Sequence, residues 1–501
     1  MYVHVSKYRN TARVRLLQKV RIDGSVKTRL VKHIGTARNK DELEILKELA
    51  KKDLIRLRYP DQLRFGIDDI PSAGIYALSD FYHGAEIIFS PLLERLNLPM
   101  KRYPLFTQLV IARLINPTSK RQTAVFLQKK LGSGFTLDQI YYLLDVIYKK
   151  RTDIQNALSS YISNTYPSAM NYLLYDVTTL YFEKDDEDPD VESGLGLRKR
   201  GYSKDHRNDL PQVVLGLCVN ELGMPLSYRL YPGNTYEGTT LGDGIKYAKN
   251  KAGARSMTVV ADAGMLSKKN LDIIRDSEMK FIVSARIKNL NANVTRQITD
   301  HDFVANPIME LDYNGDRLVI AYSRKRAAAD RARRKKSIAR LEGLIASNRA
   351  VRKHQFLKIP LRGNPSIDAM AVERASQFDG LKGYLTNDFE LSQDKIIEHY
   401  SYLPNVEQSF RMFKSDLRVR PMFHQVSQRI EAHVVLCMVC LCLMRILEQK
   451  VKPLGYTYKQ ALSIITDAHS VLIGNTKKTY LIPPLLSNEF KAIQQSLEIG
   501  E

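Results

Sequence analysis

Two kinds of apolar spacing organise the first third of this chain. Residues 1–35 alternate between apolar and polar positions, which predicts two short strands around a turn at residues 23–25. In residues 41–57, acids gather at the start and bases at the end, which suits the dipole of a helix. From residue 75 to 165, apolar residues recur every three or four positions, so this region is predicted to be mostly helical. Within it, residues 118–136 fit a DNA-binding helix pair and ordinary helical packing equally well.

The pattern changes at residue 171, where short apolar runs replace the helical spacing. These runs predict strands, and they lie at residues 171–183, 211–234, 256–266 and 280–285. A meander followed by strand, helix and strand predicts a mixed sheet with flanking helices. Residues 286–385 interrupt this pattern with charged, irregular sequence that includes one strongly basic helix candidate. Helical spacing resumes after this segment.

The net charge of the chain indicates a polyanionic partner. Lys and Arg number 76 against 54 Asp and Glu, which leaves a charge of +22, and such an excess is most often neutralised by nucleic acid. Residues 1–40 hold 11 Lys or Arg and one acid, Asp23, so their balance is 11 − 1 = +10. A second cluster places eight Lys or Arg within residues 324–336, where a solvated helix face is the alternative to a DNA contact.

Cysteine usage and apolar stretches predict a soluble, cytoplasmic protein. Three of the four cysteines, Cys437, Cys440 and Cys442, lie in one apolar helix candidate, which favours buried thiols over a zinc site. No disulfide framework is visible, as expected in a reducing compartment. The longest apolar stretch, residues 434–444, is too short to span a bilayer, and the N-terminus has no apolar signal core.

Two aspartates stand alone inside apolar, strand-like runs. They are Asp176 in NYLLYDVTTLYFE and Asp262 in TVVADAGML. A buried carboxylate costs several kcal/mol unless it is paired, hydrogen-bonded or bound to a cation. Each aspartate alone also fits a turn residue. Because carboxylates at strand ends can converge on one side of a sheet, the two together indicate a shared site.

A third acid, Glu407, lies in YSYLPNVEQSFRMFKSDLRVRP. Lys414 follows seven residues later, which is two helical turns and nearly the same face, and Arg411 flanks that face. This pattern predicts a metal ligand beside cations that bind phosphate. An exposed pair of helix charges is the alternative.

Together these segments resemble a DDE transposase of bacterial insertion sequences, in the branch whose ribonuclease H-like domain is interrupted by an insertion. The strands that carry Asp176 and Asp262 resemble the first two catalytic strands. Residues 201–217 are similar to the segment that commonly follows the first aspartate.

The last catalytic helix resembles the Tyr-Arg-Glu-Lys motif of this branch. Tyr400, Glu407 and Lys414 match its spacing, whereas Leu403 occupies the arginine position. Arg411 lies near enough in the sequence to substitute for that arginine. The resemblance covers roughly residues 170–445.

The fold that the resemblance implies is α/β, with a ribonuclease H-like mixed sheet, flanking helices and an insertion between the second Asp and the Glu. The predicted regions are a basic strand-helix region (1–70), a helical DNA-binding region (71–170), the catalytic domain (171–285 and 386–450), the insertion (286–385) and a C-terminal region (451–501).

The resemblance also implies metal-dependent cleavage at transposon ends followed by strand transfer. Asp176, Asp262 and Glu407 would be catalytic and would hold two Mg²⁺ or Mn²⁺ ions, which prefer oxygen ligands. The expected DNA contacts are Tyr400, Arg411, Lys414, Lys204, Arg207, Arg333, Arg334, Lys335 and Lys336.

The expected partner is double-stranded DNA, both transposon terminal inverted repeats and target DNA, bound by a homodimer on paired ends. No membrane partner is expected, and the protein should associate with the bacterial nucleoid when it is bound to DNA. Two alternatives remain, namely a ribonuclease H-like nuclease that cuts without joining and an inactive DNA-binding relative.

Overall fold

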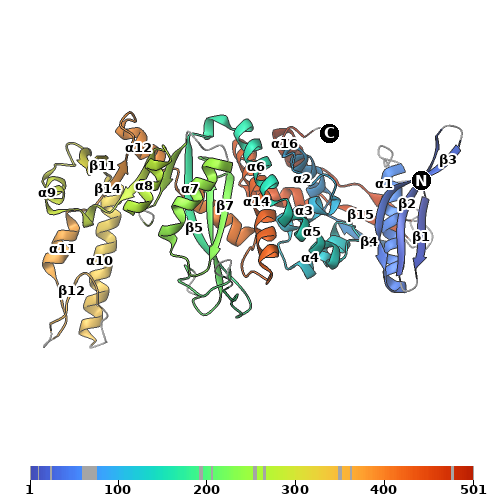
Figure 1. The fold of residues 1–501 in the computed structure, drawn as a ribbon, viewed down its shortest axis with the longest axis horizontal. Coiled ribbons are helices and arrows are strands. Elements are labelled where there is room, and N and C mark those ends of the chain that lie inside the picture. Colours follow the sequence, from blue (N-terminus) through green and yellow to red (C-terminus); the bar gives the residue numbers. More distant parts are fainter. Residues whose placement is uncertain are drawn as a thin grey trace.

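The computed structural model has an elongated arrangement with a large sheet between two end modules (Figure 1). It describes residues 2–8, 11–22, 25–58, 76–190, 196–204, 207–251, 257–262, 264, 267–347, 353–360, 364–474 and 479–499. The N-terminal strands lie at one end of the molecule and the insertion lies at the other (Figure 1). The helical region and the long C-terminal helices lie between the N-terminal module and the sheet.

The N-terminal module is a three-stranded antiparallel meander covered by one helix. Its elements are β1 (Tyr2–Tyr8), β2 (Thr11–Ile22), β3 (Ser25–Ala37) and α1 (Lys40–Arg58). It has a small core of its own, which includes Val14, Leu16, Ile34 and Leu46. The alternating pattern predicted two of these strands, and the structure adds a third. Residues 23 and 24 of the predicted turn lie outside the described residues.

The region that follows is helical, as the apolar spacing predicts. It comprises α2 (His83–Arg95), α3 (Pro104–Ile115), α4 (Lys120–Lys130), α5 (Leu137–Lys149) and α6 (Arg151–Thr165). The first strand of this region, β4 (Tyr76–Phe81), was not expected. It pairs with β15 (Ser470–Gly474), which in turn pairs with β16 (Thr479–Ile482), so its partner lies almost 400 residues away in the sequence.

The central sheet confirms the predicted mixed sheet with flanking helices. Its first five strands are β5 (Tyr172–Tyr181), β6 (Gln212–Val219), β7 (Pro225–Pro232), β8 (Thr258–Ala261) and β9 (Phe281–Ala285). They lie in the order β7-β6-β5-β8-β9. The meander β5-β6-β7 is antiparallel, whereas β8 is parallel to both β5 and β9. The flanking helices are α7 (Thr240–Lys251) and α8 (Lys268–Asp276).

The insertion continues this sheet, although its sequence was interpreted as irregular. Beyond β9 the sheet adds β14 (Leu381–Thr386), β11 (Asp316–Tyr322) and β10 (Ile308–Tyr313), all antiparallel. Asn314 and Gly315 have φ values of 57° and 82°, which suit the tight turn between β10 and β11. These strands cover the edge of β9, which would otherwise present unpaired backbone groups.

The basic segment of the insertion forms a long helix, α10 (Arg324–Ala346), which extends away from the sheet (Figure 1). The other elements of the insertion are α9 (Ala292–Asp300), β12 (Leu357–Lys358), β13 (Ser366–Ile367) and α11 (Ala369–Ser376).

Helices dominate the rest of the chain. They are α12 (Gln393–Tyr400), α13 (Pro404–Arg411), a π-helical turn (Met412–Asp416), α14 (Ser427–Val451), α15 (Tyr458–Asp467) and α16 (Asn488–Ser496). The cysteines of α14 are buried free thiols, as predicted.

The expectation that the apolar stretch is too short to cross a bilayer was wrong on length. Helix Ser427–Leu454 is long and apolar enough to do so. However, 94% of its most apolar window is buried inside the protein, as in the core helix of a folded domain.

Candidate active site

Asp176 and Asp262 lie on adjacent parallel strands at matching positions. Leu174 of β5 pairs with Val260 of β8, so each aspartate lies two residues beyond one member of that pair. Because side chains alternate along a strand, both aspartates lie on the same face, and neighbouring strands are only about 4.8 Å apart. Asp176 lies within β5, opposite Leu217 of β6, rather than in a turn. The exposed Asp262 directly follows β8.

The carboxyl group of Asp176 is poorly solvated for a charged group. Its side chain is 27% exposed. Burial raises the pKa of Asp176 to about 6, and the neighbouring Glu237 and Glu407 also raise this pKa, whereas Lys204 lowers it. A partly buried carboxylate with two acidic neighbours is stabilised by a bound cation.

Lys204 directs its ammonium group into this site, although the residue as a whole is exposed. Its Nζ donates a hydrogen bond of 2.8 Å to the carbonyl oxygen of Val177, and it lies 3.0 Å from Glu237 and 4.0 Å from Asp176. Lys204 was expected to contact DNA, and the structure gives it contacts within the protein. Glu237 was missed, because a single glutamate in the turn YEGTT carries no local signal.

Glu407 is presented by α13, which packs against β5 and β6. Its side chain is exposed, and it is close enough to Asp176 to raise the pKa of that carboxyl. Lys414 lies in the π-helical turn that follows. Burial and Lys204 lower its pKa, whereas Asp176 and Glu237 raise it, so its ammonium shares the electrostatic environment of the same site.

A buried arginine of α14 holds α13 in place. Arg445 is 2% exposed, and its Nη2 donates hydrogen bonds of 2.6 Å to the carbonyl oxygen of Asn405 and to Oγ of Ser409. Its Nη1 lies 2.6 Å from Glu448. Gly223, with φ at +73°, leaves room for this guanidinium, because an added Cβ would lie 2.4 Å from Nη2. Asn405 and Ser409 flank Glu407 in the sequence, so Arg445 fixes the backbone that presents the third acid.

Tyr400 connects the end of α12 to the second aspartate. Its hydroxyl donates a hydrogen bond of 3.2 Å to Oδ1 of Asp262, and its ring meets Tyr384 of β14 edge-on at 5.2 Å. Burial, followed by the charge of Asp262, raises the pKa of Tyr400. Tyr400 was expected to contact DNA, and the structure gives it a contact within the site. Leu403 is buried in the core, so the motif's arginine position is filled by an apolar side chain.

Lys382 is a site residue that sequence reasoning missed. It lies in β14, and its Nζ lies 3.9 Å from the centre of the Tyr400 ring. Burial, followed by the charge of Arg326, lowers the pKa of Lys382, whereas Asp262 and Glu407 raise it, and together these effects leave the pKa at about 8. Nothing in the sequence around this lysine indicated that it would lie beside Tyr400 and Asp262.

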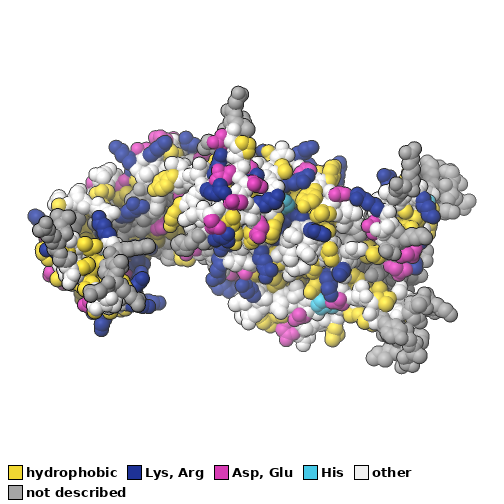
Figure 2. Space-filling view, turned by 90° about the horizontal axis from the view of Figure 1, so that it is seen from below, with side chains coloured by type: hydrophobic (Ala, Val, Ile, Leu, Met, Phe, Trp, Pro, Cys, Tyr) yellow, Lys and Arg dark blue, Asp and Glu magenta, His cyan; other side chains and the backbone are white. Residues whose placement is uncertain are grey.

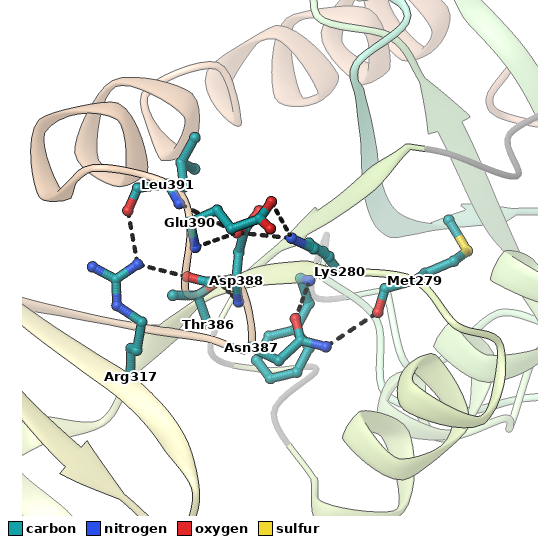
Figure 3. Close-up of polar contacts among 9 residues, drawn as sticks. Met279, Lys280, Arg317, Thr386, Asn387, Asp388, Glu390 and Leu391 are labelled. Carbon is teal, nitrogen blue, oxygen red and sulfur yellow. Dashed lines mark hydrogen bonds and ion pairs between the residues drawn. The ribbon is translucent and has the colours of Figure 1, made fainter.

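A cluster of polar contacts fixes the segment that leads into α12 (Figure 3). Lys280, just before β9, lies 3.0 Å from Asp388, and the side chain of Asn387 accepts a hydrogen bond of 2.8 Å from the backbone of Phe281. From β11, Arg317 donates hydrogen bonds to the carbonyl oxygens of Asp388 and Leu391, at 2.6 and 2.7 Å. These contacts join the insertion, β9 and the start of α12, the helix that ends at Tyr400.

The remaining residues predicted to contact DNA differ in their exposure and in the contacts they make within the protein. Arg207 lies 2.9 Å from Asp209 and 5.4 Å from the ring centre of Tyr181. Arg334 forms a bidentate ion pair with Asp379 and is 13% exposed. Arg333 is 78% exposed. Arg411, Lys335 and Lys336 are exposed as well.

The acids surround the site without forming a closed metal cage. Among the described residues, no group of three or more His, Cys, Asp or Glu side chains is close enough together to hold a metal ion. Asp176, Asp262 and Glu407 nevertheless offer only oxygen donors, which Mg²⁺ and Mn²⁺ prefer. Burial raises the pKa of Asp176, and Lys204 offsets this effect only in part. The residues therefore fit a divalent cation that would draw the three acids together.

Comparisons with known proteins agree with the geometry at the level of the family. Residues 168–443, more than half of the chain, match the family model described as the transposase DDE domain. No curated protein matches the chain. Among solved structures, the chain is similar to the Mos1 transposase paired-end complex with left transposon end, at 13% sequence identity and a TM-score of 0.16. That match covers 52% of this chain and 72% of the other.

Proposed function

Because the chain belongs to the family of DDE transposases, we propose that Asp176, Asp262 and Glu407 are the catalytic acids with which it cuts and joins DNA. The observation that carries this proposal is the register of β5 and β8, which aligns the two aspartates on one face. The effect of Glu407 on the pKa of Asp176 adds the third acid to the same electrostatic environment.

The three acids would bind two Mg²⁺ or Mn²⁺ ions through their oxygens. Such ions activate the attacking oxygen and stabilise the leaving oxygen in phosphodiester displacement. In the first step, water attacks phosphorus and the bond to the 3′-oxygen breaks, which leaves a 3′-hydroxyl on one strand and a 5′-phosphate on the other. In the second step, that 3′-hydroxyl attacks a phosphodiester of target DNA and the 3′-oxygen there leaves.

The lysines of the site would hold the phosphate that reacts. Lys414 and Lys204 both lie close enough to Asp176 to affect its pKa or to be affected by it. Lys204 neutralises Asp176 in part, so a bound cation would release it to contact phosphate oxygens. Tyr400 would hold Asp262 in position through its hydroxyl.

DNA binding would be shared between the N-terminal module, the helical region and the insertion. The proposed assembly is a two-fold dimer on paired transposon ends, since joining both ends requires that they be held at once. Within the basic run of α10, the exposed Arg333, Lys335 and Lys336 would contact DNA. Arg334 is occupied by Asp379 and is better assigned to the fold.

The test uses duplex DNA that carries the inverted repeat flanking the gene, with Mg²⁺, with Mn²⁺ or with a chelator. Asp176→Asn, Asp262→Asn and Glu407→Gln should each abolish cleavage and strand transfer while DNA affinity is kept. Asp394→Asn, an exposed acid of α12 outside the site, is the matched control. If the variants lose DNA binding as well as cleavage, the acids have a structural role. Cleavage without joined products would instead favour a nuclease.

Metal binding has a readout of its own. Mn²⁺ should raise the thermal unfolding temperature of the wild type, because a ligand that binds the folded state stabilises it. This increase should shrink in each acid variant and persist in the control.

A further inference from the structure

A groove lined by cations lies beside the site, between α10 and the strands that the insertion adds to the sheet. It encloses about 640 Å³. Its cations are Lys325, Arg326 and Arg333 of α10 and Lys382 of β14, and Tyr384 also lines it.

The positive charge of this groove has little compensation from the protein. Within the described part of the chain, Lys325, Arg326 and Lys382 form no ion pair with a carboxylate, and Arg333 has only Asp330, at 3.3 Å. Arg326 is close enough to Lys382 to lower its pKa, so the like charges repel one another. Cations brought together without acids are stabilised by a bound polyanion.

The other face of the same helix shows the contrast. Arg334 lies about 100° around α10 from Arg333 and is held by Asp379. The helix therefore uses one face to attach to the fold and leaves another face with free cations. At 100° per residue, the groove face continues through Lys336 and Arg340, both of which are exposed. The wider surface agrees, since Figure 2 shows Lys and Arg side chains on both sides of the hollow between the insertion and the rest of the molecule.

Lys382 links this groove to the catalytic acids. Its ammonium rests on the ring of Tyr400 at 3.9 Å, and the hydroxyl of Tyr400 donates to Asp262. An anion bound along the groove would therefore end beside the second aspartate. At the arginine position of the motif, Leu403 is buried and supplies no charge.

We propose that this groove binds the phosphodiester backbone of the DNA strand next to the reacting phosphate, with Lys382 as the positioning residue at its inner end. Lys382 thus supplies from β14 a positive charge that Leu403, the residue before α13, does not supply. This inference rests on the proposed function, because it assumes that DNA reacts at Asp176, Asp262 and Glu407. It adds a defined path for the strand and a residue outside the motif.

The path is tested by crosslinking in the full-length protein. All four native cysteines are buried, so an introduced surface cysteine is the reactive thiol. Ala329→Cys places a thiol in the groove, and Ala328→Cys places one on the same helix about 100° away. The probe is the inverted-repeat duplex with a bromoacetyl group attached to a phosphorothioate beside the predicted cleavage point. Crosslinking of Ala329→Cys at least tenfold faster than Ala328→Cys is expected. Equal rates would overturn the proposal.

The charges are tested by the salt dependence of DNA binding, measured with a chelator present. Arg326→Gln should reduce the slope of log K against log salt by about 0.9, as expected for one lost phosphate contact. Arg331→Gln, an exposed cation on a different face of α10, should leave the slope unchanged. Equal slopes for the two variants would exclude the groove as a backbone site. Neither the crosslinking rates nor the salt dependence of binding requires catalysis. Both can therefore support the groove even if the wild type cuts no DNA. Absence of cleavage would count only against the proposed function.

The role of Lys382 is tested by charge replacement. Lys382→Met should lower the cleavage rate at saturating DNA by tenfold or more, and Lys382→Arg should restore most of it. If Lys382 had only a structural role, both substitutions would lower the unfolding temperature and the cleavage rate together. Loss of cleavage in Lys382→Arg equal to that in Lys382→Met, with both variants folded, would show that charge is not what Lys382 contributes.

Discussion

Arg334 of α10 and Asp379 form a bidentate ion pair in which the two side chains are only 13% and 12% exposed. The pair joins the basic helix to the segment just before β14, the strand that carries Lys382. One arginine of the basic run therefore serves the fold, although the sequence presents it as equivalent to its neighbours.

Removal of this pair should destabilise the insertion. Arg334→Ala is expected to lower the free energy of unfolding by about 2–3 kcal/mol, because Asp379 would remain nearly buried without its partner. Arg333→Ala, at an exposed neighbouring position, should change it by less than about 0.5 kcal/mol. Chemical denaturation of both variants checks this. Equal, small effects would show that the pair adds nothing to stability.

Asp176 should lower the free energy of unfolding of the protein when no metal is bound. With a chelator present, Asp176→Asn is expected to raise the free energy of unfolding by about 1–2 kcal/mol at pH 8, because the pKa of Asp176 is raised to about 6. The folded protein holds this proton more tightly than the unfolded chain does. Wild-type stability therefore falls as the pH rises from about 4 to about 6 and stays at the lower value above.

The difference between variant and wild type should accordingly be small near pH 4 and complete above pH 6. Thermal unfolding across this range measures it. A difference that does not change with pH would rule out the ionisation of Asp176 as its cause.

The contact between Tyr400 and Asp262 should matter more for cleavage than for stability. Tyr400→Phe removes the hydroxyl that donates to Oδ1 of Asp262 but keeps the ring under Lys382. Loss of one hydrogen bond of about 1–1.5 kcal/mol predicts a cleavage rate lower by about 5- to 12-fold. Single-turnover cleavage at saturating DNA measures this effect. An unchanged rate would show that the hydroxyl does not position Asp262.

The anchor of α13 should be essential to the fold as well as to the site. Arg445→Met is expected to cost about 3–5 kcal/mol of unfolding free energy, because Ser409 and the backbone of Asn405 each lose a charged donor and Glu448 loses its ion pair. A milder probe is Gly223→Ala, which places a methyl group against the guanidinium. Cleavage in this variant should fall even though Glu407 is intact. Full activity would mean that α13 is held by other contacts.

The N-terminal module should contribute to DNA binding through charge. The described part of the N-terminal module has a core of its own, so deletion of residues 1–58 should leave the unfolding of the central sheet unchanged. The same deletion should weaken binding to transposon ends and flatten its salt dependence, since residues 1–40 carry a balance of +10. Anisotropy titrations at several salt concentrations measure the slope. An unchanged slope would place the contacts elsewhere.

The sequence by itself determined those features that depend on local pattern. Apolar runs around Asp176 and Asp262 predicted the strands, and helical spacing predicted the helix that carries Glu407, because burial imposes its periodicity on each element separately. Lys414 lies in the π-helical turn that continues this helix. The same patterns indicated the resemblance to DDE transposases, which the family match confirms.

Only the tertiary structure decided which distant residues meet. The insertion looked irregular because β10, β11 and β14 are stabilised by pairing with β9 rather than by a pattern of their own. That pairing brings Lys382 to Tyr400, and folding of the loop before α7 brings Glu237 to Lys204. In the same way, Arg334 differs in role from its neighbour Arg333 because it contacts Asp379, a residue 45 positions away. A single carboxylate or lysine has no periodicity, so its partner is determined by how the elements pack and not by its neighbours in the chain.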